Sequence, residues 1–349
     1  ATRLRQRVAA AAGELENLQM AFSRFAPDAA RKMSGWLRPV SMIVLFGVIA
    51  FAVGVSAEMV LANLSLNSVA ADCEDMQVRG FPFRLGVFCD SVTAISDVDS
   101  SQLSAGAFRT AAQVYNPNHI ISELDSPVTI VSPRGDRADF EWRSLQSSTV
   151  FGLNGLDRAS VHVEDSKAVM TNGADDVSLA TDTSEFHTRQ NGDNLDFAAM
   201  LRNARLATEA GDAPAFDLDL DVSVDDRAWL LSGKQPTQDY PWIGASGSLK
   251  NFVLALDNGA RIAVQGPFSI DQRGLLDGRF DLSIRDLAGV MELARGVPDP
   301  TGAIENVRSV LSTLSGTGEI KLPVTVRRGK VSIAFFTLGR IPPLRPRRY

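Results

Sequence analysis

Apolar and polar residues alternate with a period of two over most of the chain after residue 63. The clearest case is FDLDLDVSV at residues 216–224, where five apolar residues point to one face and three aspartates to the other. An Asp-Asn-Gly turn divides residues 252–264 into two alternating arms, a strong β-hairpin signal. Residues 276–285 and 320–335 alternate in the same way. We therefore expect a mainly β (α+β) protein built on a long, curved antiparallel sheet that is wet on one face.

Three other segments have apolar residues three and four positions apart, which is the spacing of an amphipathic helix. These segments are residues 104–115, 194–208 and 302–314. They predict a few helices that pack on the sheet or cap it. No long glycine, serine or proline linker interrupts residues 63–340, so we expect one extended β-rich domain there.

Nineteen residues from Pro39 to Ala57 contain no charged side chain, and with the next few they predict a transmembrane helix over residues 39–62. Seven basic and three acidic residues precede Pro39, whereas residues 39–78 contain no lysine or arginine. The positive-inside rule then places an amphipathic helical segment, residues 1–38, in the cytoplasm. A cleaved signal peptide is the rival interpretation, but the segment before the apolar run is too long for one.

The composition is that of a globular protein, and the net charge limits the class of partner. Of the 349 residues, 45% are apolar and 22% are charged, as in a globular protein with a core. The net charge is −6, and because the first 38 residues are basic, the remainder carries about −10. Such an acidic domain argues against nucleic acid as a partner.

Cys73 and Cys89 are the only cysteines. In one straight strand they would lie about 50 Å apart, too far for a disulfide. A chain reversal between them brings the two together, with Val78 opposite Phe83. The residues expected to make this turn are Gly80, Phe81 and Pro82. We predict a stabilising disulfide, which places this part of the protein in an oxidising compartment.

Three stretches carry a family resemblance: VRGFPFRLGVFCD (78–90) with a cysteine upstream, AAQVYNPNHIISELDSP (111–127) and TLGRIPPLRP (337–346). Together they resemble the alphaproteobacterial envelope family catalogued as domain of unknown function 2125. The resemblance implies a protein of the bacterial inner membrane that crosses it once, with its main domain in the periplasm and no established activity. The turn between two strands is more distantly similar to bacterial lipid-binding tubular and AsmA-like proteins, whose curved sheets hold acyl chains.

The sequence has no strong catalytic or metal-binding signature. The histidines, His119, His162 and His187, fit no zinc spacing, and the sequence contains no Gly-x-Ser-x-Gly elbow and no phosphate-binding glycine loop. Asp217, Asp219 and Asp221 are the best metal candidate, but alternate side chains on a strand stand about 6.6 Å apart, which favours a solvated face. We expect no enzyme activity, cofactor or metal site.

The apolar faces are more extensive than the few expected helices can cover. Any single strand fits the packed core of a β-sandwich, whereas a curled sheet without a second sheet opposite would offer an apolar groove to membrane lipid. The candidate groove residues are Phe83, Leu85, Val87, Phe216, Leu218, Leu220, Leu254, Leu256, Phe280, Leu282, Ile284, Ile333 and Phe335. The alternative function is a structural or assembly subunit of an inner-membrane complex that uses residues 1–62. The basic, proline-rich tail, residues 341–349, could meet anionic head groups or simply be solvated.

Overall fold

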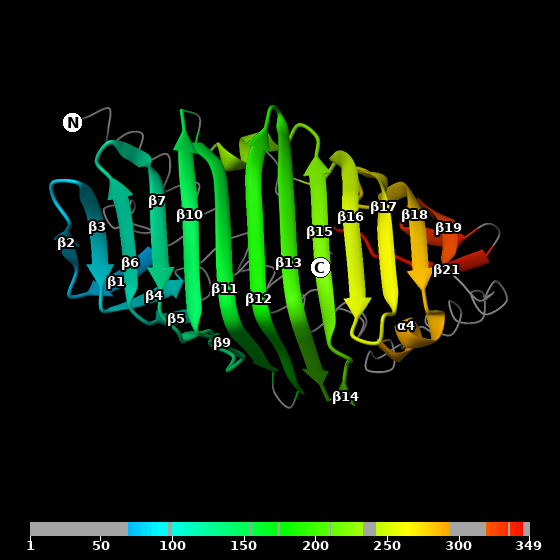
Figure 1. Ribbon diagram of the computed structural model, residues 1–349, viewed down its shortest axis with the longest axis horizontal. Helices are drawn as coiled ribbons and strands as arrows, with labels where there is room; N and C mark the ends of the chain where they lie inside the picture. The colour runs from blue at the N-terminus through cyan, green and yellow to red at the C-terminus, as the bar shows by residue number, and fades with distance from the viewer. Residues whose placement is uncertain are drawn as a thin grey trace.

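The computed structural model describes residues 69–96, 100–153, 155–172, 175–209, 211–232, 242–293, 319–333 and 336–344. The predicted segments 1–38, 39–62 and 302–314, and the end of the basic tail, lie outside these ranges. Within them the chain forms twenty-one strands, one α-helix and one 3-10 helix. None of the helices in these ranges has the length and hydropathy needed to cross a membrane. The prediction of a mainly β protein with a long antiparallel sheet is confirmed (Figure 1).

Fifteen strands pair in one antiparallel row from one end of the molecule to the other. In spatial order they are β2 (Gln77–Arg79), β3 (Arg84–Cys89), β6 (Phe108–Gln113), β7 (Asn116–Leu124), β10 (Ser144–Gly152), β11 (Gly155–Asn172), β12 (Asp175–Asn191), β13 (Asn194–Thr208), β15 (Phe216–Val224), β16 (Ser246–Leu256), β17 (Arg261–Ile270), β18 (Leu276–Arg285), β19 (Ile320–Arg327), β20 (Lys330–Ile333) and β21 (Phe336–Arg340). Neighbours in space are mostly neighbours in sequence, as short hairpin connections require.

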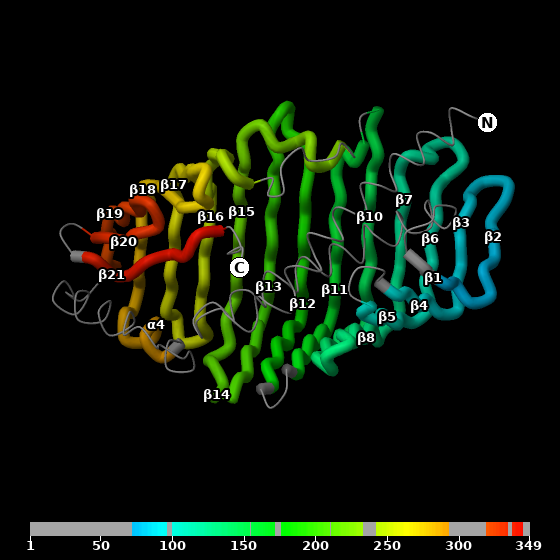
Figure 2. Tube along the Cα trace, turned by 180° about the vertical axis from the view of Figure 1, so that it is seen from behind, coloured from blue at the N-terminus to red at the C-terminus, as the bar shows by residue number. Residues whose placement is uncertain are grey.

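A second layer lies behind the N-terminal end of this row (Figure 2). Its strands, in paired order, are β1 (Val69–Glu74), β4 (Ser91–Ser96), β5 (Gln102–Ala105), β8 (Val128–Val131) and β9 (Arg137–Glu141). β9 pairs with the second half of β11, so the two layers are one continuous sheet folded over. Phe108 and Leu145 of the long row share a buried cluster with Leu103 and Ile130 of the second layer.

The fold-over depends on bends in the long strands β11 and β13. β11 pairs with β10 up to Glu164 and with β9 from Lys167, and Asp165 between them has a φ of 50°. β13 has the same kind of irregularity at Asn203, with a φ of 49°. Asp and Asn adopt this left-handed conformation more readily than other side chains. The amide of Asn203 also donates to Asp182 on β12 at 2.8 Å, which links two bent strands at the corner.

The predicted disulfide between Cys73 and Cys89 is confirmed, with 5.3 Å between the Cα atoms. The predicted hairpin pairing is wrong: Val78 lies opposite Val87, and Phe83 belongs to a wider turn. β1 pairs with β4 in the same register as β2 pairs with β3, so residues 69–79 and 84–96 are the two arms of one bent hairpin. The bond joins these two arms, as predicted, at the point where the hairpin passes from the long row into the second layer.

Gly80 is required in the turn that joins β2 to β3. Its φ is +105°, and a Cβ atom there would lie 2.9 Å from the carbonyl oxygen of Arg84. Residues with a side chain rarely adopt this conformation, and the close backbone contact removes the remaining space. The expected turn residues Gly80, Phe81 and Pro82 do reverse the chain between β2 and β3.

Two of the predicted helices are wrong. Residues 104–115 contain part of β5 and all of β6, and residues 194–208 are β13. Both segments are rich in alanine, which favours helices, but each strand is paired on both sides, so tertiary pairing overrides the intrinsic propensity. The α-helix that does occur is α4 (Leu287–Leu293), and the 3-10 helix is η1 (Ala228–Leu231). Strand β14 (Gly211–Asp212) adds a short pairing to β13.

Helix α4 lies at one end of strands β16 to β18 (Figure 1). Its amide at Gly289 donates to the Asp286 carboxylate at 3.2 Å, an N-terminal cap. Leu287 and Val290 pack into the main buried cluster. At the opposite end of the same strands, the indole of Trp242 donates to the carbonyl of Leu344 at 2.9 Å, so the chain after β21 lies along the sheet end.

Candidate functional site

Two rows of apolar side chains cross the long sheet on one surface, called here the inner face. The register places the members of each row directly opposite one another on successive strands. The first row is Leu201, Leu218, Leu254, Ile262, Ile284 and Ile320. The second row, from β12 to β19, is Phe186, Ala199, Leu220, Phe252, Val264, Leu282 and Leu322. Cross-strand pairing thus turns separate alternating strands into one continuous apolar surface.

The predicted groove residues divide by exposure. Five are buried: Phe216, Leu218, Leu256, Ile284 and Ile333. Five keep part of their surface accessible: Val87, Leu220, Leu254, Phe280 and Leu282. Phe83 and Leu85 are exposed by 77% and 48%, and Phe335 lies outside the described residues. The structure therefore brings the groove residues of β15 to β20 together, and it separates Phe83 and Leu85 from them at the far N-terminal end.

The inner face also carries hydroxyl groups near the bend. Thr181 bonds to Ser166 at 2.6 Å and to Ser184 at 2.7 Å, all three buried. On β10 the hydroxyls of Ser147 and Thr149 are buried without a hydrogen-bond partner. Buried hydroxyls without a partner are uncommon, because each costs part of its hydration free energy. The inner face is therefore mixed on β10 to β12 and purely apolar further along the row.

The opposite surface of the sheet, called here the outer face, is polar and closely ion-paired. Asp219 pairs with Arg202 at 2.6 Å, and Asp221 lies 3.8 Å from Lys250. Asp217 accepts a hydrogen bond from a backbone amide. Each aspartate of the ladder has a partner of its own, and among the described residues no three histidine, cysteine or carboxylate groups gather to hold a metal ion.

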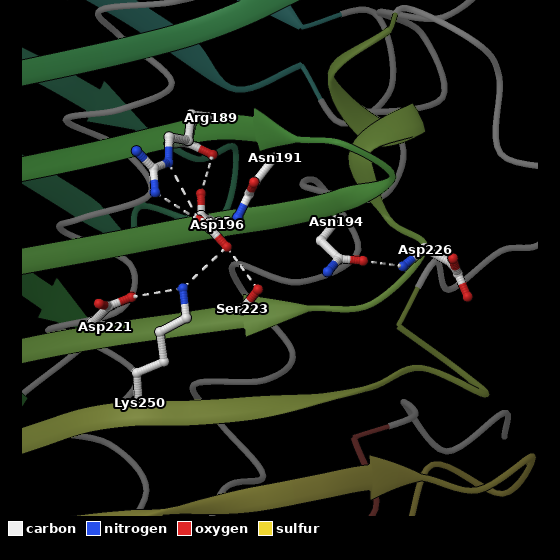
Figure 3. A network of polar contacts seen from close by, with 9 residues as sticks. Arg189, Asn191, Asn194, Asp196, Asp221, Ser223, Asp226 and Lys250 are labelled. Atoms are coloured by element: carbon white, nitrogen blue, oxygen red, sulfur yellow. Dashed lines mark hydrogen bonds and ion pairs between the residues drawn. The ribbon is translucent and has the colours of Figure 1, made fainter.

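Asp196 on β13 is the centre of a network that spans four strands of the outer face (Figure 3). Its carboxylate accepts hydrogen bonds from Arg189 at 3.0 Å, Lys250 at 3.3 Å and Ser223 at 2.6 Å. Asn191 donates to it at 3.1 Å. The Asp196 side chain is only 8% exposed. The network therefore joins β12, β13, β15 and β16 where the sheet is broadest.

The pKa of Asp196 is about 2, below its ordinary value of 3.8. Burial of the carboxyl group raises this pKa, but the hydrogen bonds from Ser223, Arg189 and Lys250 and the charge of Lys250 lower it by more. The group is ionised at neutral pH. Because its partners lie on the neighbouring strands of the outer face, Asp196 holds these strands together.

The histidines are held by neighbours on adjacent strands. His119 lies 2.9 Å from the hydroxyl of Ser148. His162 and His187 both lie 3.2 Å from Glu185, with His187 also 2.9 Å from Ser160. His119 belongs to strand β7.

A family comparison agrees with the resemblance read from the sequence. The profile described as an uncharacterized protein conserved in bacteria, DUF2125, matches residues 47–342. The chain belongs to this family. No curated protein and no solved structure shows significant similarity to the chain. The match includes the cysteine pair, the β2–β3 turn and β21.

Sequence reasoning missed two features of this surface. Asp196 lies in the segment expected to be a helix, although Leu195 and Phe197 alternate with Asp196 and Ala198 as a strand requires. The exposed aromatic turn around Phe81 was treated only as a chain reversal. Its signal was a run of large apolar residues in a turn, where solvation favours polar ones.

Proposed function

We propose that this protein is anchored in the bacterial inner membrane by residues 39–62 and that its periplasmic sheet binds a lipid or another apolar envelope molecule on the inner face. The observation that carries the proposal is the pair of unbroken apolar rows across β12 to β19. Leu201, Leu218 and Ile284 of these rows are already buried within the protein. The members that keep accessible surface favour an apolar partner, because their contact with water is unfavourable.

The two ends of the long row differ in what covers them. The N-terminal strands pack against the second layer, so their apolar side chains form an ordinary core. Over the C-terminal strands the described cover is α4, seven residues at one end of the strands, together with β20 and β21, whose Ile333 and Leu338 are buried in the same cluster (Figure 2). Leu220, Phe280 and Leu282 keep accessible surface there. The C-terminal part of the inner face is therefore the preferred place for a ligand.

The membrane anchor and the disulfide support the same location. The uncharged segment 39–57 is long enough to span a bilayer, and the basic residues before it favour a cytoplasmic N-terminus. The Cys73–Cys89 disulfide suits the oxidising periplasm. A protein tethered in this way has membrane lipid as its most abundant apolar neighbour. The network of outer-face ion pairs keeps the opposite surface in water.

Native mass spectrometry of the full-length protein extracted in mild detergent tests the proposal. Phe280 lies on the inner face, paired with Val324, and the adjacent Arg279 points to the outer face. We expect Phe280→Gln to lower the fraction of protein that carries lipid several-fold, and Arg279→Gln to leave it unchanged. Thermal unfolding of both variants controls for folding.

Equal lipid occupancy in both variants, or lipid-free protein throughout, would contradict the proposal. Lipid-free protein recovered in a stable complex with other membrane proteins would favour the alternative, an assembly subunit that binds through residues 1–62. A truncation of residues 1–35 then separates the two functions: it would abolish partner recovery in an assembly subunit and leave lipid occupancy unchanged in a lipid-binding protein.

A further inference from the structure

Large exposed apolar residues are concentrated at one corner of the molecule. Of the eleven such residues in the described part of the chain, seven lie in the strand β2 region, the turn into β3 and the turn from β6 to β7. They are Met76, Val78, Phe81, Phe83, Leu85, Val114 and Tyr115. Phe81 and Tyr115 are 82% and 77% exposed. We call these seven residues the aromatic corner.

The two turns of the aromatic corner are direct neighbours. The amide of Val114 donates to the carbonyl of Phe83 at 3.1 Å, and Arg84 lies opposite Gln113 in the sheet. Both turns lie at the same end of their strands, at the N-terminal extremity of the long row (Figure 1). The exposed side chains therefore form one continuous surface. Soluble proteins rarely leave such a patch uncovered unless it contacts a partner or a membrane.

The charge around the aromatic corner selects among partners. Residues 76–89 contain two arginines, Arg79 and Arg84, both exposed, and no acidic residue, although the domain as a whole is strongly acidic. Aromatic rings with adjacent arginines are the side chains that occupy the boundary between lipid head groups and acyl chains. Arg79 also lies over the ring of Phe88, 5.3 Å from its centroid.

The chain length before the sheet fixes the distance to the bilayer. Six residues separate the predicted membrane helix, which ends at residue 62, from Val69 at the start of β1, a span of at most about 20 Å. From Val69, the start of β1, eleven residues lead to the turn at Gly80, about 35 Å of strand at most. The disulfide ties this arm to β3. The aromatic corner is therefore within reach of the membrane surface.

The geometry points to insertion of the aromatic corner into the outer leaflet interface of the membrane, with anionic phospholipid as the binding partner. This inference rests on the membrane attachment in the proposed function, but it does not require lipid on the inner face. It assigns an orientation: the N-terminal end of the sheet meets the bilayer, and the long apolar row extends away from it into the periplasm.

Depth-dependent quenching tests this orientation in the full-length protein. The native cysteines are bonded to each other, so Phe81→Cys gives a single site for an environment-sensitive fluorophore. Asp257→Cys, in the exposed turn between β16 and β17 at the opposite end of the strands, is the matched control. The protein is reconstituted into vesicles of phosphatidylcholine and phosphatidylglycerol that contain doxyl-labelled lipid, and flotation confirms that it is bound.

We expect lipid quenching at position 81 to exceed that at position 257 at least twofold, with iodide quenching in the reverse order. If iodide quenches positions 81 and 257 equally although the protein floats with the vesicles, the inference is wrong and the proposed membrane anchor still holds. Protein that does not float would overturn both. Protection of position 81 from iodide without lipid quenching would also overturn it, and would indicate a second copy of the chain as the partner instead.

Discussion

Cys73 and Cys89 join two layers of one folded sheet, with their Cα atoms 5.3 Å apart. Cys73 belongs to β1 of the second layer, and Cys89, only 2% exposed, belongs to β3 of the long row. The two cysteines lie on opposite arms of one bent hairpin, because β1 pairs with β4 in the same register as β2 pairs with β3. The amide of Asp90 also donates to the carbonyl of Glu74 at 2.9 Å beside the disulfide, so the covalent bond reinforces the backbone pairing at the bend.

Replacing both cysteines by serine should lower the free energy of unfolding by about 3 kcal/mol, because the bond closes a short loop of chain in the unfolded state. Urea unfolding of the full-length protein in detergent, followed by tryptophan fluorescence, to which Trp142 beside the buried cluster contributes, measures this change. The single variants Cys73→Ser and Cys89→Ser should each lower the free energy of unfolding by about the same amount as the double variant. An unchanged unfolding midpoint would show that the layers hold together without the bond.

Asp196 should make the free energy of unfolding depend on pH in the acid range. Its folded-state pKa of about 2 lies below the ordinary value of 3.8, so its contribution is fully present above pH 4 and is lost as the pH falls toward 2. The shift corresponds to about 2 kcal/mol. Asp196→Asn should remove this contribution at pH 7 and flatten the decline between pH 4 and pH 2.

The control for Asp196 is Asp281→Asn, an exposed carboxylate on the same face of the sheet. Chemical unfolding of both variants at pH 7, 4 and 2 gives the comparison. If Asp196→Asn and Asp281→Asn lower the free energy of unfolding by the same small amount at pH 7, the Asp196 network does not stabilise the sheet. The same conclusion follows if the stability of Asp196→Asn declines with acid as that of the unmodified protein does.

The bend at Asn203 gives a third prediction. Its φ of 49° is easier for glycine than for alanine, while both substitutions remove the side-chain bond to Asp182. Asn203→Ala should therefore be less stable than Asn203→Gly by about 1 kcal/mol. Thermal unfolding of the pair isolates the backbone contribution. Equal melting temperatures would mean that the left-handed conformation is not what the bend requires.

The alternating segments allowed much of the sheet to be predicted from sequence. The hairpin around Asp257 and Asn258 appears with Leu254 opposite Ile262, and residues 216–224 place their apolar side chains on one face. Local alternation was sufficient because these strands pair with their sequence neighbours. The predicted apolar residues of β15 to β20 lie on the same face for the same reason.

The folded-over layer could not be predicted, because it depends on pairings between distant segments. The pairing of β9 with the second half of β11, and of β5 with β8, follows from the bends at Asp165 and Asn203, and single Asp and Asn residues give little local signal. The alanine-rich strands β6 and β13 were mistaken for helices, since propensity favoured a helix where pairing on both sides imposed a strand. The Asp196 network was hidden by that error.

Photo-crosslinking along β15 in intact cells tests the central claim most directly. A photoreactive amino acid at Leu220 faces the apolar inner surface, and one at Asp221 faces the polar outer surface beside Lys250. If the inner face holds phospholipid, ultraviolet irradiation of cells grown with labelled phosphate will attach label to the protein at position 220 and not at position 221. Equal labelling at the two positions, or none at position 220, would contradict lipid binding on this sheet.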